Sequence, residues 1–368
     1  MTIYIHRLYD WPSFRWDHEA LSAVLASVRY RQGRLIGRMA SLGAQLREEA
    51  VLRTLTEDVL QTCDIEGEVL DQAQVRSSLA RRLGLDIAAT VPADSHIVGI
   101  VEVILDATRH HSKSLDDERL FAWHSALFPT GRSGMTKITV GAWRGYSSGP
   151  MQIVSGPIGR EKVHYQAPTA AKLVLEMKAF LGWFNADTPL DPVLKAGIAH
   201  FWFVTIHPFD DGNGRIARAI ADLMLARSEG SPQRFYSMSA QIRHERGTYY
   251  DMLERTQKGG LDITPWLMWF LGCLDRAFDG AELTLTSVLR KARFWEQHSQ
   301  SSLNERQRLM LNRLLDGFEG KLTSSKWAKL AKCSQDTAHR DIDGLVRLRA
   351  LVKERAAGRS TSYAIVDD

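Results

Sequence analysis

The 368-residue sequence has little cysteine and no apolar run long enough to cross a membrane. Its three cysteines, Cys63, Cys273 and Cys333, are odd in number and widely spaced. This pattern argues against a disulfide framework or a zinc site. The N-terminus lacks a basic segment followed by an apolar core, so no signal peptide is expected. With 44% hydrophobic and 24% charged residues, the composition is that of a soluble globular protein, and we expect a cytoplasmic protein with no membrane partner.

The length indicates two or three domains, and the hydrophobic spacing predicts a mainly α fold. We expect a helical N-terminal domain, a central domain, a linker helix and a small C-terminal domain, over residues 1–110, 111–285, 286–302 and 303–368. The helices expected in the first two domains cover residues 17–39, 42–62, 116–128, 168–185 and 191–206. A stretch rich in glycine and β-formers, 135–165, predicts a strand over 151–156.

The most informative segment is residues 207–218, which read His-Pro-Phe-Asp-Asp-Gly-Asn-Gly-Arg-Ile-Ala-Arg. Its Gly-Asn-Gly precedes a run of strong helix formers, so these glycines fall at a helix N-terminus. Free backbone N–H groups and the helix dipole make an anion site there, and glycine lets a phosphate approach the backbone. Arg215 and Arg218 lie three residues apart on one helical face and suit phosphate oxygens. The segment therefore predicts a site for nucleotide phosphates.

Two further side chains of this segment suggest chemistry. Asp211 directly precedes the glycines and is predicted to hold Mg²⁺, which usually takes one or two carboxylates plus substrate phosphates. His207 is suited to accept the proton of an incoming hydroxyl, because the imidazole pKa lies near neutral pH. Each piece alone is more typical of a turn, a helix stop or a solvated charge pair. All of them in this order favour a catalytic site.

The segment resembles the signature of the Fic family, His-x-Phe-x-(Asp/Glu)-Gly-Asn-Gly-Arg-x-x-Arg, at every defined position. Fic enzymes mostly transfer AMP from ATP to a Ser, Thr or Tyr hydroxyl of a protein. The resemblance implies a helical Fic-type core with a small β-hairpin flap, ATP as substrate, Mg²⁺ as cofactor, and a target that is another protein or the chain itself. It implies His207 as the general base and Asp211 as the Mg²⁺ ligand. The remaining implied contacts are Gly212, Asn213 and Gly214 with the α-phosphate region, and Arg215 and Arg218 with the β- and γ-phosphates.

Two details refine this resemblance. A phosphate-transferring branch has Lys at the position of Gly214, so glycine favours nucleotidyl transfer over phosphoryl transfer. Tyr249 and Tyr250 resemble positions in the last core helices, where a tyrosine either lines the nucleotide pocket or packs in the core. His200, on an apolar helix, is read as a core histidine.

A second motif, residues 62–68, reads Thr-Cys-Asp-Ile-Glu-Gly-Glu. By itself it is an acidic helix end followed by glycine. It also resembles the Fic inhibitory pattern (Ser/Thr)-x-x-x-Glu-(Gly/Asn), which Thr62, Glu66 and Gly67 fit. Its position before the core motif resembles the branch with an N-terminal inhibitory helix (class II). The resemblance implies that Glu66 pairs with Arg218 and excludes the γ-phosphate, and that Glu66 alternatively positions a water for AMP removal.

The resemblance to the Fic family implies that the strand expected at 151–156 is part of a flap that docks a target segment beside the active site. Backbone pairing with an extended peptide would place the hydroxyl without demanding much sequence. An ordinary surface hairpin is the alternative. The candidate docking residues are Gln152, Ile153, Val154 and Ser155.

Residues 303–368 predict three helices followed by two strands, an order that resembles a winged helix-turn-helix. This segment has 13 Lys and Arg against 9 Asp and Glu, a net charge of +4, which equals the +4 of the whole chain. The basic surplus therefore lies here, as in a phosphate-binding module. DNA is one candidate partner, and a protein-binding or dimerising role, including a homodimer, is another. The candidate DNA contacts are Thr337, His339, Arg340 and Arg359. The alternative function is a DNA-binding regulator that uses the Fic core as a nucleotide sensor or self-modifying switch.

Overall fold

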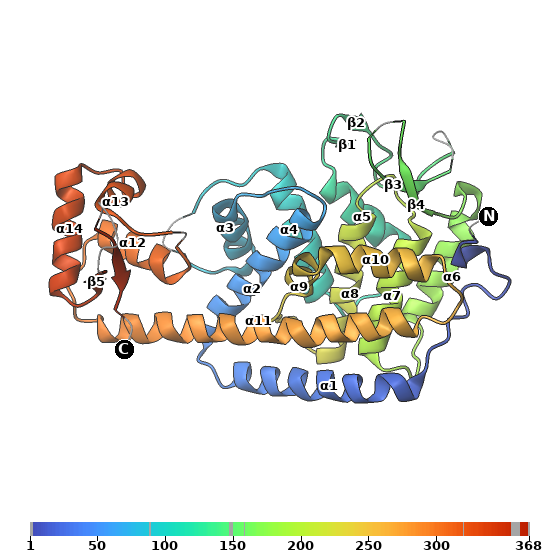
Figure 1. The fold of residues 1–368 in the computed structure, drawn as a ribbon, viewed down its shortest axis with the longest axis horizontal. Helices are drawn as coiled ribbons and strands as arrows, with labels where there is room; N and C mark the ends of the chain where they lie inside the picture. Colours follow the sequence, from blue (N-terminus) through green and yellow to red (C-terminus); the bar gives the residue numbers. More distant parts are fainter. Residues whose placement is uncertain are drawn as a thin grey trace. The chain divides into compact units, whose positions relative to one another are not determined.

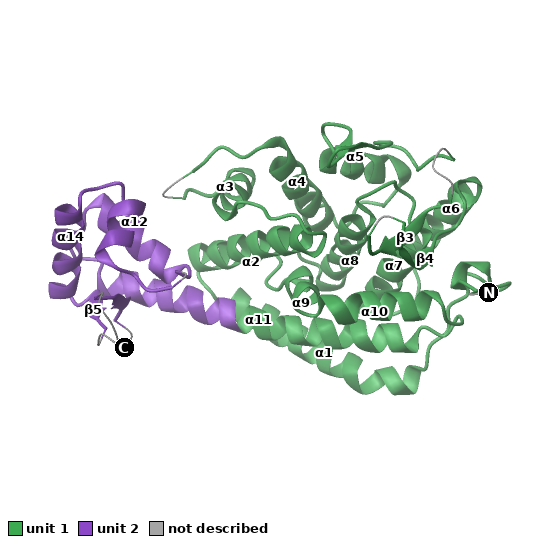
Figure 2. Ribbon diagram, turned by 45° about the horizontal axis from the view of Figure 1, so that its top comes forward, with its two compact units in different colours: residues 1–282 green, residues 283–368 purple. Residues whose placement is uncertain are grey.

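The computed structural model describes residues 3–87, 90–146, 150–157, 159–318, 320–354 and 361–366. The described chain is mainly helical and divides into two compact units, residues 1–282 and 283–368 (Figure 1, Figure 2). The division falls within helix α11 (Thr264–Gln297), close to the expected start of the linker helix at 286. Arg359, one of the candidate DNA contacts, lies outside the described residues.

The first unit contains most of the helices and two β-hairpins. Its elements before α11 are η1 (Ile5–Arg7), α1 (His18–Ala40), α2 (Ala44–Ile65), α3 (Gln72–Leu83), α4 (Ser95–Arg109), α5 (Asp117–Leu127), β1 (Arg132–Ser133), β2 (Thr136–Lys137), β3 (Gln152–Ser155), β4 (Lys162–Gln166), η2 (Ala170–Lys172), α6 (Leu173–Asn185), α7 (Pro192–Ile206), α8 (Asn213–Glu229), α9 (Met238–His244) and α10 (Arg246–Gln257). The five helices predicted from the hydrophobic spacing correspond to α1, α2, α5, α6 and α7.

Local capping explains where many of these helices begin and end. Five of them start after an aspartate whose carboxylate accepts backbone N–H groups of the first turn: Asp17, Asp71, Asp94, Asp116 and Asp191. Helices α3 and α8 end at Gly84 and Gly230, both in the left-handed conformation that glycine adopts without steric cost. Helix α1 lies along the first part of α11, where Arg31 donates to Asp275 at 2.9 Å (Figure 1).

Helix α7 forms the centre of the first unit. Every residue from Val193 to Ile206 is buried, and a helix that is apolar all round belongs in a core. Helix α8 packs along it. The end of α7 and the start of α8 are therefore both fixed by core packing, and so is the short connection between them, residues 207–212.

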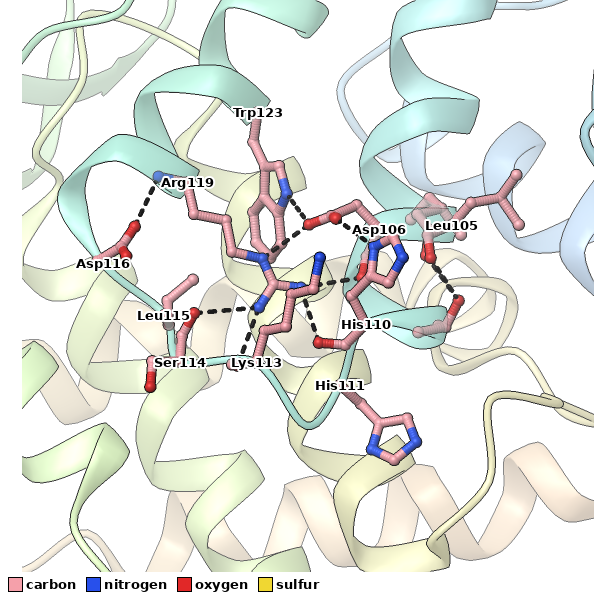
Figure 3. A network of polar contacts seen from close by, with 12 residues as sticks. Leu105, Asp106, His110, His111, Lys113, Ser114, Leu115, Asp116, Arg119 and Trp123 are labelled. Atoms are coloured by element: carbon pink, nitrogen blue, oxygen red, sulfur yellow. Dashed lines mark hydrogen bonds and ion pairs between the residues drawn. The ribbon is translucent and has the colours of Figure 1, made fainter.

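A polar network fixes the connection between α4 and α5 (Figure 3). The guanidinium of Arg119 donates to Oδ2 of Asp106 at 2.7 Å and to four backbone carbonyls of the connecting loop and the end of α4. The indole of Trp123 donates to the same Asp106 oxygen at 2.7 Å. Because α5 is held by these contacts, its C-terminal end, including Phe128, has a defined place beside the 207–212 connection.

The strands are few and short. Strand β3, inside the predicted 151–156, pairs antiparallel with β4, with Gln152 opposite Gln166 and Ser155 opposite Lys162. The register shifts between Ile153 and Val154, as in a β-bulge. We call this hairpin, residues 152–166, the flap; residue 158 within it is not described.

The second unit contains the end of α11, three shorter helices and one β-hairpin. These are α12 (Glu305–Leu315), α13 (Ser324–Leu330), α14 (Gln335–Arg347), β5 (Leu351–Lys353) and β6 (Tyr363–Ile365). Asn304 and Gln307 form a reciprocal capping box at the start of α12, and Ser334 caps α14. The unit has its own core, centred on Trp327 and Ile342. The order of helices and strands is the predicted one.

Cys63 and Cys273 are buried free thiols, and Cys333 is partly buried and also free. Among the described residues, no helix combines the length and the apolar character needed to cross a membrane.

Candidate active site

His207 ends α7 in the left-handed conformation, with φ 52°. A residue other than glycine rarely adopts this conformation, and strained backbone of this kind clusters at functional sites. The ring Nδ1 lies 3.2 Å from the carbonyl oxygen of Val204. A carbonyl only accepts, so Nδ1 carries the proton and donates. In the neutral ring the other nitrogen, Nε2, therefore keeps a lone pair that can accept a proton.

Burial, together with the nearby positive charge of Arg144, lowers the pKa of His207 to about 4, although the Val204 hydrogen bond opposes the shift. The imidazole is consequently neutral at physiological pH. A neutral imidazole with Nε2 unprotonated is the form that a general base requires.

Arg144 holds the backbone around His207, although sequence reasoning did not single it out. This buried guanidinium donates to the carbonyl of His207 at 2.7 Å and to that of Pro168 at 2.6 Å. Its backbone N–H donates to the carbonyl of Pro208 at 2.9 Å. No local sequence pattern marks Arg144, because it lies in a stretch without helix or strand periodicity.

Phe209 and Asn213 brace the loop from inside. Phe209 is fully buried and stacks on His124, with ring centroids 4.1 Å apart. The amide of Asn213 accepts from the N–H of Phe209 at 3.0 Å and donates to its carbonyl at 2.9 Å. The predicted phosphate-region contact Asn213 thus closes the loop onto itself through its side-chain amide.

Asp211 faces the loop after α5. Its Oδ2 accepts a hydrogen bond from the hydroxyl of Ser133, and its Oδ1 accepts the N–H of Gly212 at 2.6 Å. The ring of His124 donates to the backbone carbonyl of Asp211 at 3.1 Å. Asp210 points elsewhere and accepts the N–H of Thr139 at 2.8 Å. Asp211 is therefore the carboxylate of this pair that lies beside the glycine turn and the hydroxyl of Ser133.

The glycines of the turn are required by space and by backbone conformation. Gly212, at φ 81°, caps α8, and a Cβ there would lie 2.8 Å from the ring of Phe128. A Cβ on Gly214 would lie 2.3 Å from Oε1 of Glu66 and 3.2 Å from Arg218. The inhibitory motif and the catalytic segment, far apart in sequence, thus meet at Gly214.

Arg218 is bound by the inhibitory motif. It is 2% exposed. Its Nε donates to the hydroxyl of Thr62 at 2.7 Å, and its Nη2 donates to the Thr62 carbonyl at 2.9 Å and to Oε1 of Glu66 at 2.8 Å. The third guanidinium nitrogen, Nη1, is buried without a hydrogen-bond partner among the described residues.

Gly67 completes a helix-ending turn that positions Glu66. Gly67 has φ 85°, the N–H of Glu68 donates to the carbonyl of Cys63 at 3.0 Å, and the N–H of Gly67 donates to that of Asp64 at 3.0 Å. This pair of bonds is a Schellman motif, in which glycine is the favoured left-handed residue. The turn, residues 63–68, is called the inhibitory turn below, after the family pattern that its sequence resembles.

Arg215 is the second buried guanidinium of the segment. Its Nη1 donates to Oε2 of Glu68 at 2.8 Å, and its charge lies over the ring of Phe128. Its Nε lacks a hydrogen-bond partner within the described part of the chain. Buried polar atoms normally have partners, so the orphaned donors of Arg215 and Arg218 are consistent with an anion that is bound here during function. Sequence reasoning missed Glu68, which fits no signature position.

The two tyrosines differ in their surroundings. Tyr249 is buried, hydrogen-bonds His200 at 2.9 Å and packs on Trp266 and Trp269. This geometry favours the packing role for Tyr249. Tyr250 is 39% exposed, and its hydroxyl donates to the carbonyl of Ile65 at 3.4 Å, at the end of α2.

The flap presents three of its four candidate docking residues at the surface. Gln152, Val154 and Ser155 are exposed, and Ile153 is half-buried. The hydroxyl of Ser155 lies 2.6 Å from Nε2 of His164, whose Nδ1 donates to Glu254 of α10. The flap is thereby tied to α10 and leaves backbone groups of β3 near the surface.

In the second unit, three of the four candidate DNA contacts lie on α14. His339 and Arg340 are exposed, and Thr337 is half-buried with its backbone N–H bound by Ser334. Asp341, one turn after Thr337, is buried against Arg306, 2.9 Å from its Nε. Helix α14 therefore keeps one polar face outside.

Comparison with known proteins gives a family match over the segment that contains this site. Residues 114–225 match the Fic/DOC family, and residues 4–85 match a domain of unknown function (DUF4172). The chain is 27% identical over 229 residues to the protein adenylyltransferase Fic of Culex quinquefasciatus, a match that covers 61% of this chain and 41% of that protein. The equivalent protein of Drosophila persimilis is 26% identical over 287 residues, covering 72% and 54%. The chain thus spans about two fifths to one half of these relatives.

Solved structures show the same fold. A Fic family protein from Desulfovibrio desulfuricans superposes with a TM-score of 0.51 at 21% identity, covering 95% of this chain and 96% of that one. Residues 134–508 of Fic-1 from C. elegans superpose with a TM-score of 0.50 at 20% identity, covering 72% and 74%. Residues 114–225 are therefore similar to a Fic/DOC domain, the mainly helical fold is shared with these structures, and the chain is similar to proteins named protein adenylyltransferase.

Proposed function

We propose that this protein is an ATP-dependent protein adenylyltransferase that its own Glu66 holds inhibited. One observation carries the proposal. Two buried guanidinium groups, Arg215 and Arg218, lie at the N-terminal end of α8 with unpartnered donors, and a neutral His207 lies at the end of α7. The phosphates of a nucleotide triphosphate would accept hydrogen bonds from the unpartnered donors of Arg215 and Arg218. The hydroxyl of a target would donate its proton to His207.

The transfer follows from these positions. Nε2 of His207 takes the proton of the target hydroxyl, and that oxygen forms a bond to the α-phosphorus as the bond to pyrophosphate breaks. Arg215 and Arg218 balance the charge that builds on the leaving pyrophosphate, and the N–H groups at the start of α8 balance that of the α-phosphate. The strained conformation of His207, held by Arg144, keeps Nε2 directed away from Val204.

The residues present also fit Mg²⁺. Asp211 offers one half-buried carboxylate beside the glycine turn, and Ser133 adds a hydroxyl. One carboxylate plus phosphate oxygens and waters is the ordinary Mg²⁺ environment. Bound there, Mg²⁺ would neutralise phosphate charge. Asp211 is the residue that would hold it.

Glu66 restrains the reaction in this proposal. Its carboxylate occupies Arg218, so a γ-phosphate must displace a charge-assisted bond in a buried site, where such bonds are strong. The same carboxylate, next to the α-phosphate site, is also suited to orient a water that removes AMP from a modified target.

The test is labelling with ATP that carries radioactive phosphorus at the α-phosphate, with Mg²⁺, in cell lysate and with the pure protein. We compare wild type, Glu66→Gly and Glu66→Gly/His207→Ala. Glu57→Gly is the matched control, since Glu57 is exposed on the same helix. We expect the label to rise only in Glu66→Gly and to disappear in Glu66→Gly/His207→Ala. No label in any variant, or equal label in wild type and Glu66→Gly, contradicts the proposal.

A second candidate function is DNA-binding regulation through the second unit. The exposed His339 and Arg340 on α14 favour it, together with the basic surplus of residues 303–368. On this proposal the Fic/DOC domain acts as a nucleotide sensor or modifies the chain itself. Binding of a specific duplex that changes with ATP, without any labelled protein, would favour this function over the first.

A further inference from the structure

Three side chains of metal-binding type meet beside the inhibitory turn. Cys63 lies in the last turn of α2, Glu68 ends the inhibitory turn, and His96 lies in the first turn of α4. One donor atom from each lies within 4.8 Å of the other two. A thiol, an imidazole and a carboxylate form a donor set that favours borderline-soft divalent ions over Mg²⁺ or Ca²⁺.

The orientation of His96 matches that of a metal ligand. Its Nδ1 lies 3.3 Å from the carbonyl oxygen of Leu127, so Nδ1 donates there. Its Nε2 faces Glu68 Oε2 at 3.1 Å. Metal-binding histidines commonly donate one ring N–H to a backbone carbonyl, which orients the ring and directs the other nitrogen to the ion.

The surroundings leave room for the ion and a water. Cys63 is fully buried. Glu68 and His96 also line a cavity of about 470 Å³, together with Leu127, Phe128 and Ser133. This cavity gives access from solvent and space for a fourth ligand.

We propose that Cys63, Glu68 and His96 bind a zinc-type divalent ion, with water in the fourth position. Tetrahedral bonds of 2.0–2.3 Å place ligand atoms roughly 3.5 Å apart, so the three groups must move together by about 1 Å. Glu68 can make this movement, because its side chain is 41% exposed and follows the end of the helix.

Binding exchanges two protons for one divalent ion, so the net charge of the site does not change. Without an ion, both ring nitrogens of His96 face acceptors, the carbonyl of Leu127 and Oε2 of Glu68, so the ring is an imidazolium. Binding of M²⁺ releases the proton of His96 and that of the Cys63 thiol, and forms the M–N, M–S and M–O bonds. No oxidant or reductant is involved.

The ion would join both ends of the inhibitory turn. Cys63 and Glu68 flank Glu66, and Glu68 also accepts from Arg215. Fixing Cys63 and Glu68 stabilises the turn that holds Glu66 against Arg218. This second part rests on the proposed function, whereas metal binding itself does not.

The experiment uses the full chain, stripped of metal and titrated with Co²⁺ and then Zn²⁺. We expect one ion per chain, a thiolate-to-Co²⁺ charge-transfer absorption, and its loss when Zn²⁺ displaces Co²⁺. Cys63→Ser and His96→Gln should abolish the absorption and weaken binding by more than the roughly 100-fold typical of losing an outer partner. Cys333→Ser, which changes a cysteine of the second unit, should retain both.

Circular dichroism checks that both variants are folded. Absence of the absorption in wild type, or its retention in Cys63→Ser, overturns the proposal. A third measurement separates the regulatory part. Zn²⁺ should lower AMP labelling by wild type and leave Glu66→Gly unchanged. If Co²⁺ binds as expected but no variant is ever labelled, the proposed function fails and the metal site stands.

Discussion

The carboxylate of Glu66 lies so close to Gly214 that a Cβ on this glycine would be 2.3 Å from Oε1 of Glu66. Gly214→Ala should therefore displace Glu66 and destabilise the wild type by about 1 kcal/mol, but not the Glu66→Gly variant, because the clash is then absent. Urea unfolding of the two single variants and the double variant measures this coupling. Additive changes would show that Glu66 does not occupy this position in solution.

Thr62→Val tests the second contact of Arg218. The substitution keeps the side-chain shape but removes the oxygen that accepts from Nε of Arg218. A buried charged donor without an acceptor costs about 1–3 kcal/mol, and we expect this loss in the free energy of unfolding, together with increased AMP labelling. Thr56→Val is the control, because buried Thr56 on the same helix bonds only within its own helix, to the carbonyl of Leu52. An equal effect in both variants would contradict a specific role for Thr62.

Arg144→Lys should slow the reaction with little change in nucleotide binding. An ammonium cannot replace the fork that spans the carbonyls of His207 and Pro168. A small misplacement of a reacting group costs roughly 100-fold in rate. In the Glu66→Gly background we expect a labelling rate reduced by this order and an ATP affinity that stays within about twofold. Exposed Arg109→Lys is the control, and a large loss of ATP affinity in Arg144→Lys would argue against a positioning role.

The pH dependence should follow the lowered pKa of His207. The folded pKa is about 4, below the ordinary value of 6.5, so the folded state excludes a proton that the unfolded state binds. Stability linked to His207 is therefore fully present above pH 6.5 and decreases as pH falls from 6.5 toward 4. The acid limb of kcat/KM for the Glu66→Gly variant should lie near pH 4 to 5. An acid limb at 6.5 would mean that His207 is solvated like a free imidazole.

Arg340→Ala should weaken retention on duplex DNA if the second unit binds it. Each lost phosphate contact lowers the slope of log affinity against log salt by about 0.9. The control is Arg313→Ala, which removes the same charge from the exposed side of α12. Equal losses in both variants would indicate diffuse charge attraction instead of a contact by α14.

Much of the site was predictable from sequence because its chemistry is contiguous. Residues 207–218 place His207, Asp211, the glycine turn and both arginines within one loop and one helix start, where local backbone geometry fixes their order. The requirement for glycine at 67 also follows from local structure, a left-handed helix end. The hydrophobic spacing similarly predicted α7, because an apolar run of this length belongs in a core.

The tertiary structure decided the contacts between segments that are far apart in the chain. Arg144 and His124 carry no periodic signal, yet packing brings one to the backbone of His207 and the other onto Phe209. The wide spacing of the three cysteines argued against a zinc site. That spacing could not show that Cys63 meets Glu68 and His96 in the folded chain. Sequence alone determined the local chemistry of the 207–218 loop, since neighbouring residues have few possible geometries. Only folding decided which distant side chains complete it, because those contacts depend on how the helices pack around α7.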